Sequence, residues 1–216
     1  MSNSKTSLPG KFITLEGTEG AGKSTNLAFI QTWLSEQGIE HIVTREPGGT
    51  DIGEAIRAVL LNKEFTAMHD ETELLLMFAA RAQHLKEKIL PAIEQGKWVI
   101  SDRFTDATYA YQGAARGIEF SRIAEIENWV QQGFQPDTTF IFDLPVEIGM
   151  QRVASRGGEI DRFEQEKLSF FEKVRAAYLT RAQQAPSRYA RLDASQSIDK
   201  VQAAMVERLQ KLIKEA

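Results

Sequence analysis

The sequence predicts a single α/β domain in which helices cover both faces of a five-stranded parallel sheet. Short β-rich runs alternate along the chain with longer helical patterns, which is typical of a parallel sheet. The runs are apolar along most of their length, as expected for strands that are buried on both faces. No internal repeat, low-complexity tract or linker divides the 216 residues. The length suits one domain with a substantial core.

The order of the elements follows from these runs. The predicted strands are Phe12–Glu16, Ile39–Thr44, Trp98–Asp102, Thr138–Asp143 and Tyr189–Asp193. The predicted helices are Ser24–Glu36, Ile52–Leu61, Asp70–Gln95, Ser121–Gln132, Pro145–Ser155, Gln165–Gln183 and Ser197–Glu215, and three of them end at a glycine. We expect residues 1–10 to form a flexible tail and residues 11–216 to form the domain.

Composition excludes several classes of function. The net charge is −4, and no stretch carries five or six like charges, so binding to nucleic acid or to a membrane surface is not favoured. No apolar run reaches the length of a signal peptide or a membrane-spanning helix, so we expect a cytoplasmic protein. The chain has no cysteine, which excludes disulfides, a thiol nucleophile and a Cys-based zinc site.

The sequence EGTEGAGKST at residues 16–25 directly follows the first predicted strand. Gly17, Gly22, Lys23 and Ser24 match the pattern G-x-x-x-x-G-K-[ST], and a helix is predicted to follow. The glycines let successive main-chain N–H groups point at one phosphate chain, and the helix N-terminus adds partial positive charge. Lys23 can neutralise the distal phosphates, and Ser24 can hold Mg²⁺. This segment therefore predicts a nucleoside triphosphate site.

Three classes of triphosphate-binding protein must be separated. The chain lacks the N-K-x-D and D-x-x-G motifs of a guanine-specific switch, and it lacks the second signature and greater length of a motor or transporter ATPase. A kinase for a small phosphorylated acceptor needs a second anion site, so arginines should follow several strands. A nucleotide-gated binding module is the non-enzyme alternative, since it would bind ATP without transferring a phosphoryl group.

Arginines do follow the second and third predicted strands. Arg45 stands in TREPGGT, where Pro47 and two glycines predict a sharp turn, and an exposed arginine in a simple turn is the alternative. Asp102 and Arg103 close the third strand. The carboxylate can hold Mg²⁺ through water and the guanidinium can clamp a phosphate, although the two could instead form a local ion pair.

A third arginine-rich segment spans residues 152–164. Arg152 and Arg156 share a helix face, Gly157 and Gly158 interrupt the helix, and Arg162 follows. This pattern suits a lid that closes over the transferred phosphoryl group and excludes water. A charged, solvated surface loop is the alternative.

The segments EGTEGAGKST, TREPGGT, SDRFTDATYAYQG and RGGEIDRFEQE, in this order and spacing, together resemble the bacterial thymidylate kinases. The resemblance covers about Phe12 to Asp193. It implies the P-loop nucleotide-kinase fold with a short arginine-containing lid, and transfer of a phosphoryl group from ATP, with Mg²⁺, to dTMP. It also implies a cytoplasmic homodimer. A kinase for another nucleoside monophosphate, or for a broader set of them, is the alternative.

The resemblance also implies roles for individual residues. The implied ATP-binding residues are Gly17, Gly20, Ala21, Gly22, Lys23, Ser24, Thr25 and Arg152. The implied catalytic residues are Lys23, Arg103, Arg156, Arg162 and Glu19, the last as a carboxylate on the acceptor or metal side. The implied metal-binding residues are Ser24, Asp102 and Glu164. The implied acceptor-binding residues are Arg45, Pro47, Arg57, Phe78, Arg81, Arg103, Thr108, Tyr111, Gln112, Asp161 and Phe163.

Several of these assignments have a structural alternative. Thr108 and Gln112, one helical turn apart, could hydrogen-bond the edge of a pyrimidine, and Tyr111 would crowd the sugar 2′ position, but all three could simply pack within a helix. Many relatives place a base-stacking Phe four residues before the arginine that corresponds to Arg81. Here Met77 has that spacing and Phe78 is three residues before, so either could face the base or pack in the core. Whether the bond before Pro47 is cis also stays open.

Overall fold

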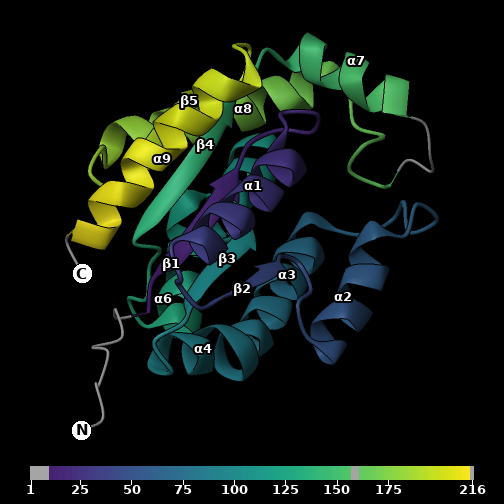
Figure 1. Cartoon of the computed structure of the whole chain (residues 1–216). Helices are drawn as coiled ribbons and strands as arrows, with labels where there is room; N and C mark the ends of the chain where they lie inside the picture. Colours follow the sequence, from purple (N-terminus) through teal and green to yellow (C-terminus); the bar gives the residue numbers. More distant parts are fainter. Residues whose placement is uncertain (1–9, 157–160, 215–216) are drawn as a thin grey trace, which may run out of the picture.

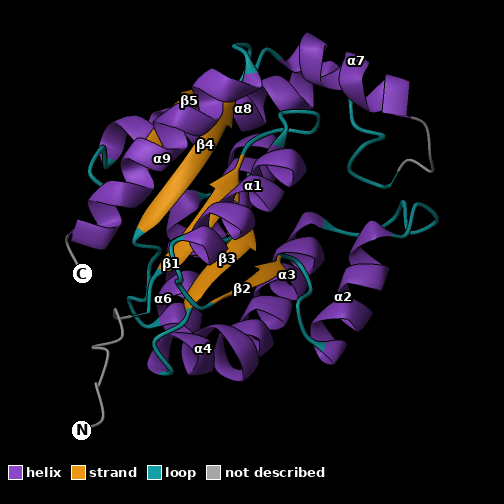
Figure 2. Cartoon of the chain, viewed as in Figure 1, coloured by secondary structure: helices purple, strands orange, loops and turns teal. Residues whose placement is uncertain are grey.

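The computed structural model describes residues 10–156 and 161–214, without the side chain of Arg156. The predicted tail, apart from Gly10, and the lid residues 157–160 lie outside this range. The described strands are β1 (Phe12–Glu16), β2 (His41–Arg45), β3 (Trp98–Asp102), β4 (Thr138–Asp143) and β5 (Tyr189–Asp193). They form one sheet in the order β2-β3-β1-β4-β5, and all neighbouring pairs are parallel. The predicted five-stranded parallel sheet is confirmed (Figure 2).

Helices connect the strands and cover the sheet. The described helices are α1 (Lys23–Glu36), α2 (Asp51–Leu61), α3 (Asp70–His84), α4 (Leu90–Glu94), α5 (Thr105–Thr108), α6 (Phe120–Gln131), α7 (Val146–Arg156), α8 (Leu168–Gln184) and α9 (Ile198–Lys214), with π-helical segments η1 (Leu85–Ile89) and η2 (Tyr109–Ala115). No described helix has the length and apolar character needed to cross a membrane.

The side chains of the strands alternate between two helical layers. Ile13 of β1 packs with α1 and α9, whereas Phe12 packs with η1 and α4 on the opposite face. Phe140 of β4 faces the α1 and α9 layer, and Ile141 packs against α8 and η2. This alternation with a period of two residues explains why the strands are apolar along their length. Figure 1 shows α1 and α9 side by side in front of the sheet.

Two helical regions differ from the prediction. The predicted helix Asp70–Gln95 exists as α3, η1 and α4 in succession, so a π-helical segment with wider turns interrupts it. Residues 105–115, predicted only as a helical turn, form α5 and η2. π-Helical segments occur frequently at functional sites. Here η2 carries two of the predicted acceptor-binding side chains.

The carboxyl ends of β1, β2 and β3 meet at one edge of the sheet. Leu15 of β1 lies opposite Asp102 of β3, and Asp102 in turn lies opposite Arg45 of β2. The glycine-rich segment and the two arginine-containing turns therefore begin at neighbouring points. Ligands of open α/β sheets bind at this edge.

Candidate active site

The glycine-rich segment turns tightly from β1 into α1. Gly17 has φ 144°, and a Cβ there would lie 2.7 Å from the carbonyl oxygen of Phe142, so the loop packs too closely on β4 for any side chain. Lys23 Nζ donates to the carbonyl oxygens of Gly17 (2.9 Å) and Thr18 (3.0 Å). Burial, together with repulsion from Arg103, lowers the pKa of Lys23.

The turn after β3 orients Arg103. Its φ of 71° is unusual for a residue other than glycine, and three hydrogen bonds hold the turn in place. The main-chain N–H of Arg103 donates to Leu15 O (3.0 Å), Ser101 Oγ donates to Arg103 O (2.7 Å), and the N–H of Phe104 donates to Glu16 Oε1 (2.7 Å). Strained backbone held by its surroundings is characteristic of functional sites.

The Arg103 side chain is fixed by two partners. Its Nη2 donates to Glu19 Oε1 (2.5 Å) and to Tyr111 Oη (2.9 Å), and Tyr111 Oη donates to Glu19 Oε2 (2.8 Å). Burial alone would raise the pKa of Glu19, but the charges of Arg103 and Lys23 lower it, so Glu19 stays ionised. Glu19 therefore stabilises and positions the Arg103 cation, and its predicted role on the acceptor or metal side stays a prediction.

Two clefts meet at this arginine. One cleft lies between α2, α3 and η2, and the other runs along the glycine-rich segment. Glu19, Arg57, Arg103 and Asp161 line both of them. Two ligands lying in these clefts would therefore face each other across a boundary that carries two guanidinium groups. Such an arrangement offsets repulsion between two phosphate-bearing ligands.

Most of the predicted acceptor residues line the first cleft. They are Pro47, Arg57, Arg81, Arg103, Thr108, Tyr111, Gln112, Asp161 and Phe163. The bond between Glu46 and Pro47 is cis. The predicted residues on the second cleft are Glu19, Gly20, Ala21, Gly22, Lys23, Ser24, Thr25, Asp102, Arg103, Arg152 and Glu164.

Arg81 lies buried at the end of the first cleft away from the glycine-rich segment. Its Nε donates to Glu46 Oε2 (2.7 Å), and its Nη2 donates to Thr108 Oγ1 (3.0 Å). His84 holds Glu46 from the other side, with 3.0 Å between Nδ1 and Oε1. Among the described side chains, Arg81 Nη1 is a buried nitrogen without a hydrogen-bond partner, so the cleft contains an available donor. The ring of Phe78 lies 4.8 Å from the guanidinium.

Phe78, which the resemblance places among the acceptor-binding residues, does not line the first cleft. Phe78 is buried with Leu74, Tyr109 and Ile123, whereas Met77 lines the cleft. Residues 77 and 81 are four apart and share a helix face, so Met77 is directed to the same side of α3 as Arg81. Phe78 is rotated further round α3, and α6 covers it.

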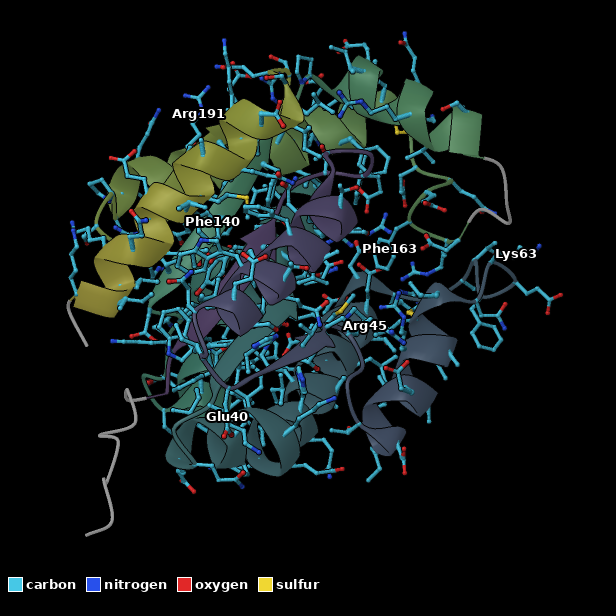
Figure 3. All side chains as sticks on the ribbon, viewed as in Figure 1. Glu40, Arg45, Lys63, Phe140, Phe163 and Arg191 are labelled. Carbon is cyan, nitrogen blue, oxygen red and sulfur yellow. The ribbon has the colours of Figure 1, made fainter. Side chains whose placement is uncertain are left out.

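The predicted residues Arg45 and Arg162 also line neither of the two clefts. The Arg45 side chain is 54% exposed, donates to Glu54 Oε2 (2.8 Å) and lines a separate hollow at β2 (Figure 3). Because side chains alternate along a strand, the burial of Thr44 turns Arg45 to the opposite face. Arg162 donates to Glu73 Oε2 (2.5 Å) and to Leu60 O (2.8 Å), which directs its side chain to α2 and α3 instead of to the glycine-rich segment.

The remaining predicted lid residues border the clefts. Arg152 Nη1 donates to Gly20 O (3.2 Å), so α7 reaches over the glycine-rich segment. The carboxylate of Asp161 accepts the N–H groups of Phe163 and Glu164 in a tight turn, and α8 begins at Leu168, three residues later than predicted. Phe163, which is labelled in Figure 3, packs edge-on against Tyr111. The side chain of Arg156 lies outside the described part of the chain.

Sequence reasoning missed several buried acidic groups that hold the site together. Glu16 accepts a hydrogen bond from the turn after β3, Glu46 binds Arg81, and Glu73 binds Gln112 and two arginines. One signal was available for Glu73, because it lies four residues before Met77 and eight before Arg81 on one helix face. A carboxylate on such a buried face requires a partner.

A parallel sheet with a glycine-rich phosphate loop between β1 and α1, and a second cleft lined by arginines, defines a P-loop nucleotide kinase. Comparison with known proteins agrees. The family model described as thymidylate kinase matches residues 15–205. The chain therefore belongs to the thymidylate kinase family.

Similar proteins match over nearly their whole length. A thymidylate kinase from Chromohalobacter salexigens is 58% identical over 202 residues, covering 93% of this chain and 95% of that protein. One from Thiobacillus denitrificans is 58% identical, covering 95% and 99% of the two chains. One from Pseudomonas putida strain GB-1 is 57% identical, covering 90% and 92%.

Proposed function

We propose that this protein transfers the γ-phosphoryl group of ATP to the 5′-phosphate of dTMP, forming ADP and dTDP. The observation that carries the proposal is the shared boundary of the two clefts at Arg57 and Arg103. ATP would lie along the glycine-rich segment, with its γ-phosphate at this boundary. dTMP would fill the other cleft, with its phosphate at the boundary and its base near Arg81.

The chain's own cations supply the charge stabilisation. An oxygen of the acceptor phosphate is already nucleophilic, so the reaction needs no strong general base. Arg103 would contact both phosphates, and Lys23 would leave its carbonyl partners to bind the distal phosphates of ATP. Arg103 is already held by Glu19 and Tyr111, so it would stabilise the charge of the transition state with little reorganisation.

The deep end of the acceptor cleft suits a base with a carbonyl group. Arg81 is paired with Glu46, and its free Nη1 offers a donor beside Thr108. Because Arg57 and Arg103 lie at the boundary of the clefts, we assign the acceptor phosphate to them and the base to Arg81. The resemblance implies a phosphate contact for Arg81 instead, and this placement departs from it.

The residues proposed to hold Mg²⁺ fit that ion. Ser24, Asp102 and Glu164 all line the ATP cleft and offer oxygen ligands, and Asp102 Oδ1 is buried without a hydrogen-bond partner among the described groups. In the described residues, no three His, Cys, Asp or Glu side chains gather as a metal site. Mg²⁺ often binds through one or two carboxylates together with substrate phosphates. Bound there, it would offset charge on the phosphate oxygens.

We further propose that the protein acts in the cytoplasm as a homodimer. Helices α3 and α6 pack against each other and expose Leu75 and Trp129, whose exposed fractions are 57% and 79%. Large exposed apolar side chains on adjacent helices are typical of protein interfaces. A second copy of the chain would bury them.

The activity is tested by measuring ADP formation with ATP, Mg²⁺ and one acceptor at a time. We expect dTMP to give the highest kcat/KM among dTMP, dUMP, UMP and dGMP. A higher value for another acceptor would favour the broader nucleotide-kinase alternative. ATP binding without acceptor-dependent ADP formation would contradict the proposed activity.

A further inference from the structure

Glu73 is a buried carboxylate next to the acceptor cleft. It lies on α3 with 1% of its surface exposed, and it contacts two residues in and next to η2 and one residue ahead of α8. Gln112 Nε2 of η2 donates to its Oε1 (2.7 Å), Arg116 Nη2 donates to its Oε2 (3.3 Å), and Arg162 Nη2 donates to its Oε2 (2.5 Å). Gln112 lines the cleft.

The hydrogen bond to Glu73 fixes the orientation of the Gln112 side-chain amide. Both carboxylate oxygens of Glu73 are acceptors, so only the NH₂ group of the amide can face them. The reversed amide would place two oxygens in contact inside a buried site, which is strongly unfavourable. With Nε2 committed to Glu73, the other end of the planar group, Oε1, is the end available to a ligand in the cleft.

We propose that Glu73 is a specificity-determining positioning residue, which fixes the Gln112 carboxamide so that its oxygen accepts a hydrogen bond from the imide N–H of a thymine or uracil ring. The proposal rests on the proposed function, because it concerns the acceptor of that reaction. Cytosine has an unprotonated ring nitrogen at the same position, so it would place an acceptor against the acceptor of Gln112. A site built around buried polar groups rejects a ligand that leaves them unpaired.

The two guanidinium groups on Glu73 strengthen this arrangement. Arg116 and Arg162 both donate to the carboxylate and so occupy it against other donors, while Arg116 also binds Glu166 Oε1 (2.5 Å). Charge-assisted hydrogen bonds to a fully ionised carboxylate are stronger than neutral ones. Glu73 therefore retains one orientation of Gln112 before any ligand enters.

The test compares dTMP with 5-methyl-dCMP, which differ only at N3 and C4 of the ring. In the unmodified protein we expect dTMP to be strongly preferred in kcat/KM. Glu73→Gln can face Gln112 with either end of its own amide, so the preference should fall by at least about tenfold. A merely structural role would lower both kcat/KM values together and leave their ratio unchanged, and that result would overturn the proposal.

A charge-balanced pair of variants guards against misfolding. Glu73→Gln alone removes the negative charge that faces two arginines. The double variant Glu73→Gln with Arg116→Met also removes one of the positive charges and is the test. The single variant Arg116→Met is its control. We expect Arg116→Met to retain the dTMP preference, because Gln112 keeps its bond to Glu73, and the double variant to lose at least about tenfold of it. An equal preference in these two proteins would overturn the proposal. Absence of dTMP turnover in the unmodified protein would instead contradict the proposed function.

Discussion

At the scale of single residues, Arg103 provides the central positive charge of the candidate site. Its backbone is held by hydrogen bonds from β1 and β3, and its guanidinium is held by Glu19 and Tyr111. Burial opposes the charge, but Glu19 raises the pKa of Arg103 well above its usual range, so the side chain stays cationic. The result is a fixed positive charge at the boundary of the two clefts.

This position predicts a contrast between two arginines. Arg103→Ala should lower kcat/KM for dTMP by about 100-fold or more, because a charge aimed at the transferring group is lost. Arg45→Ala removes only a half-exposed ion pair with Glu54, worth at most about 1 kcal/mol, so its effect should stay below about fivefold. Steady-state kinetics, with circular dichroism to verify folding, make the comparison. Equal losses in the two variants would contradict the site geometry.

At the scale of elements, Glu16 connects β1, the turn after β3, and α8. Its Oε1 accepts the N–H of Phe104 (2.7 Å), and its Oε2 accepts the hydroxyl of Tyr178 (2.8 Å). Burial, and then the charge of Asp106 on α5, raise the pKa of Glu16 to about 8, against lowering contributions from Tyr178, Phe104 and Arg103. The carboxyl group is therefore protonated in the folded chain near neutral pH.

The raised pKa predicts how stability depends on pH. The unfolded chain releases the Glu16 proton near its ordinary pKa of 4.5, whereas the folded chain holds it to about pH 8, so raising the pH between these values favours unfolding. Glu16→Gln keeps both hydrogen bonds and cannot ionise. The free energy of unfolding of this variant minus that of the unmodified protein should increase by at least about 1 kcal/mol between pH 5 and pH 9.

Urea denaturation at the two pH values makes this measurement. Tyr178→Phe is the matched control, because it removes one hydrogen bond but leaves the titrating carboxyl in place, so the pH trend of the unmodified protein should persist. If the free energy of unfolding of Glu16→Gln minus that of the unmodified protein stayed constant or fell between the two pH values, a raised pKa for Glu16 would be contradicted.

The elements also show what the sequence could predict. Each of the five strands was predictable from its apolar run, and the phosphate loop from its spacing, because both depend on local patterns. Whether Met77 or Phe78 lines the acceptor cleft depends on how α3 is rotated against α6. The direction of Arg45 depends on which face of β2 is buried. Glu16, Glu46 and Glu73 were missed because a single carboxylate carries no local signal, and its partners lie far away in the sequence.

At the scale of the whole molecule, the sheet brings two ligand clefts to one edge. The ATP cleft follows from the β1–α1 loop, and the acceptor cleft is formed by α2, α3 and η2. Segments after α7 border both clefts through Asp161. In the proposed reaction one nucleotide fills each cleft, and their phosphates meet between Arg57 and Arg103.

The most direct test is the binding of adenosine and thymidine joined 5′ to 5′ through a chain of five phosphates. We expect this compound to compete with both ATP and dTMP, and to bind at least about tenfold more tightly than ADP or dTMP alone, because joining the two makes the second contact intramolecular. Competition with only one substrate, or binding no tighter than that of ADP, would contradict the claim that the two clefts form a single transfer site.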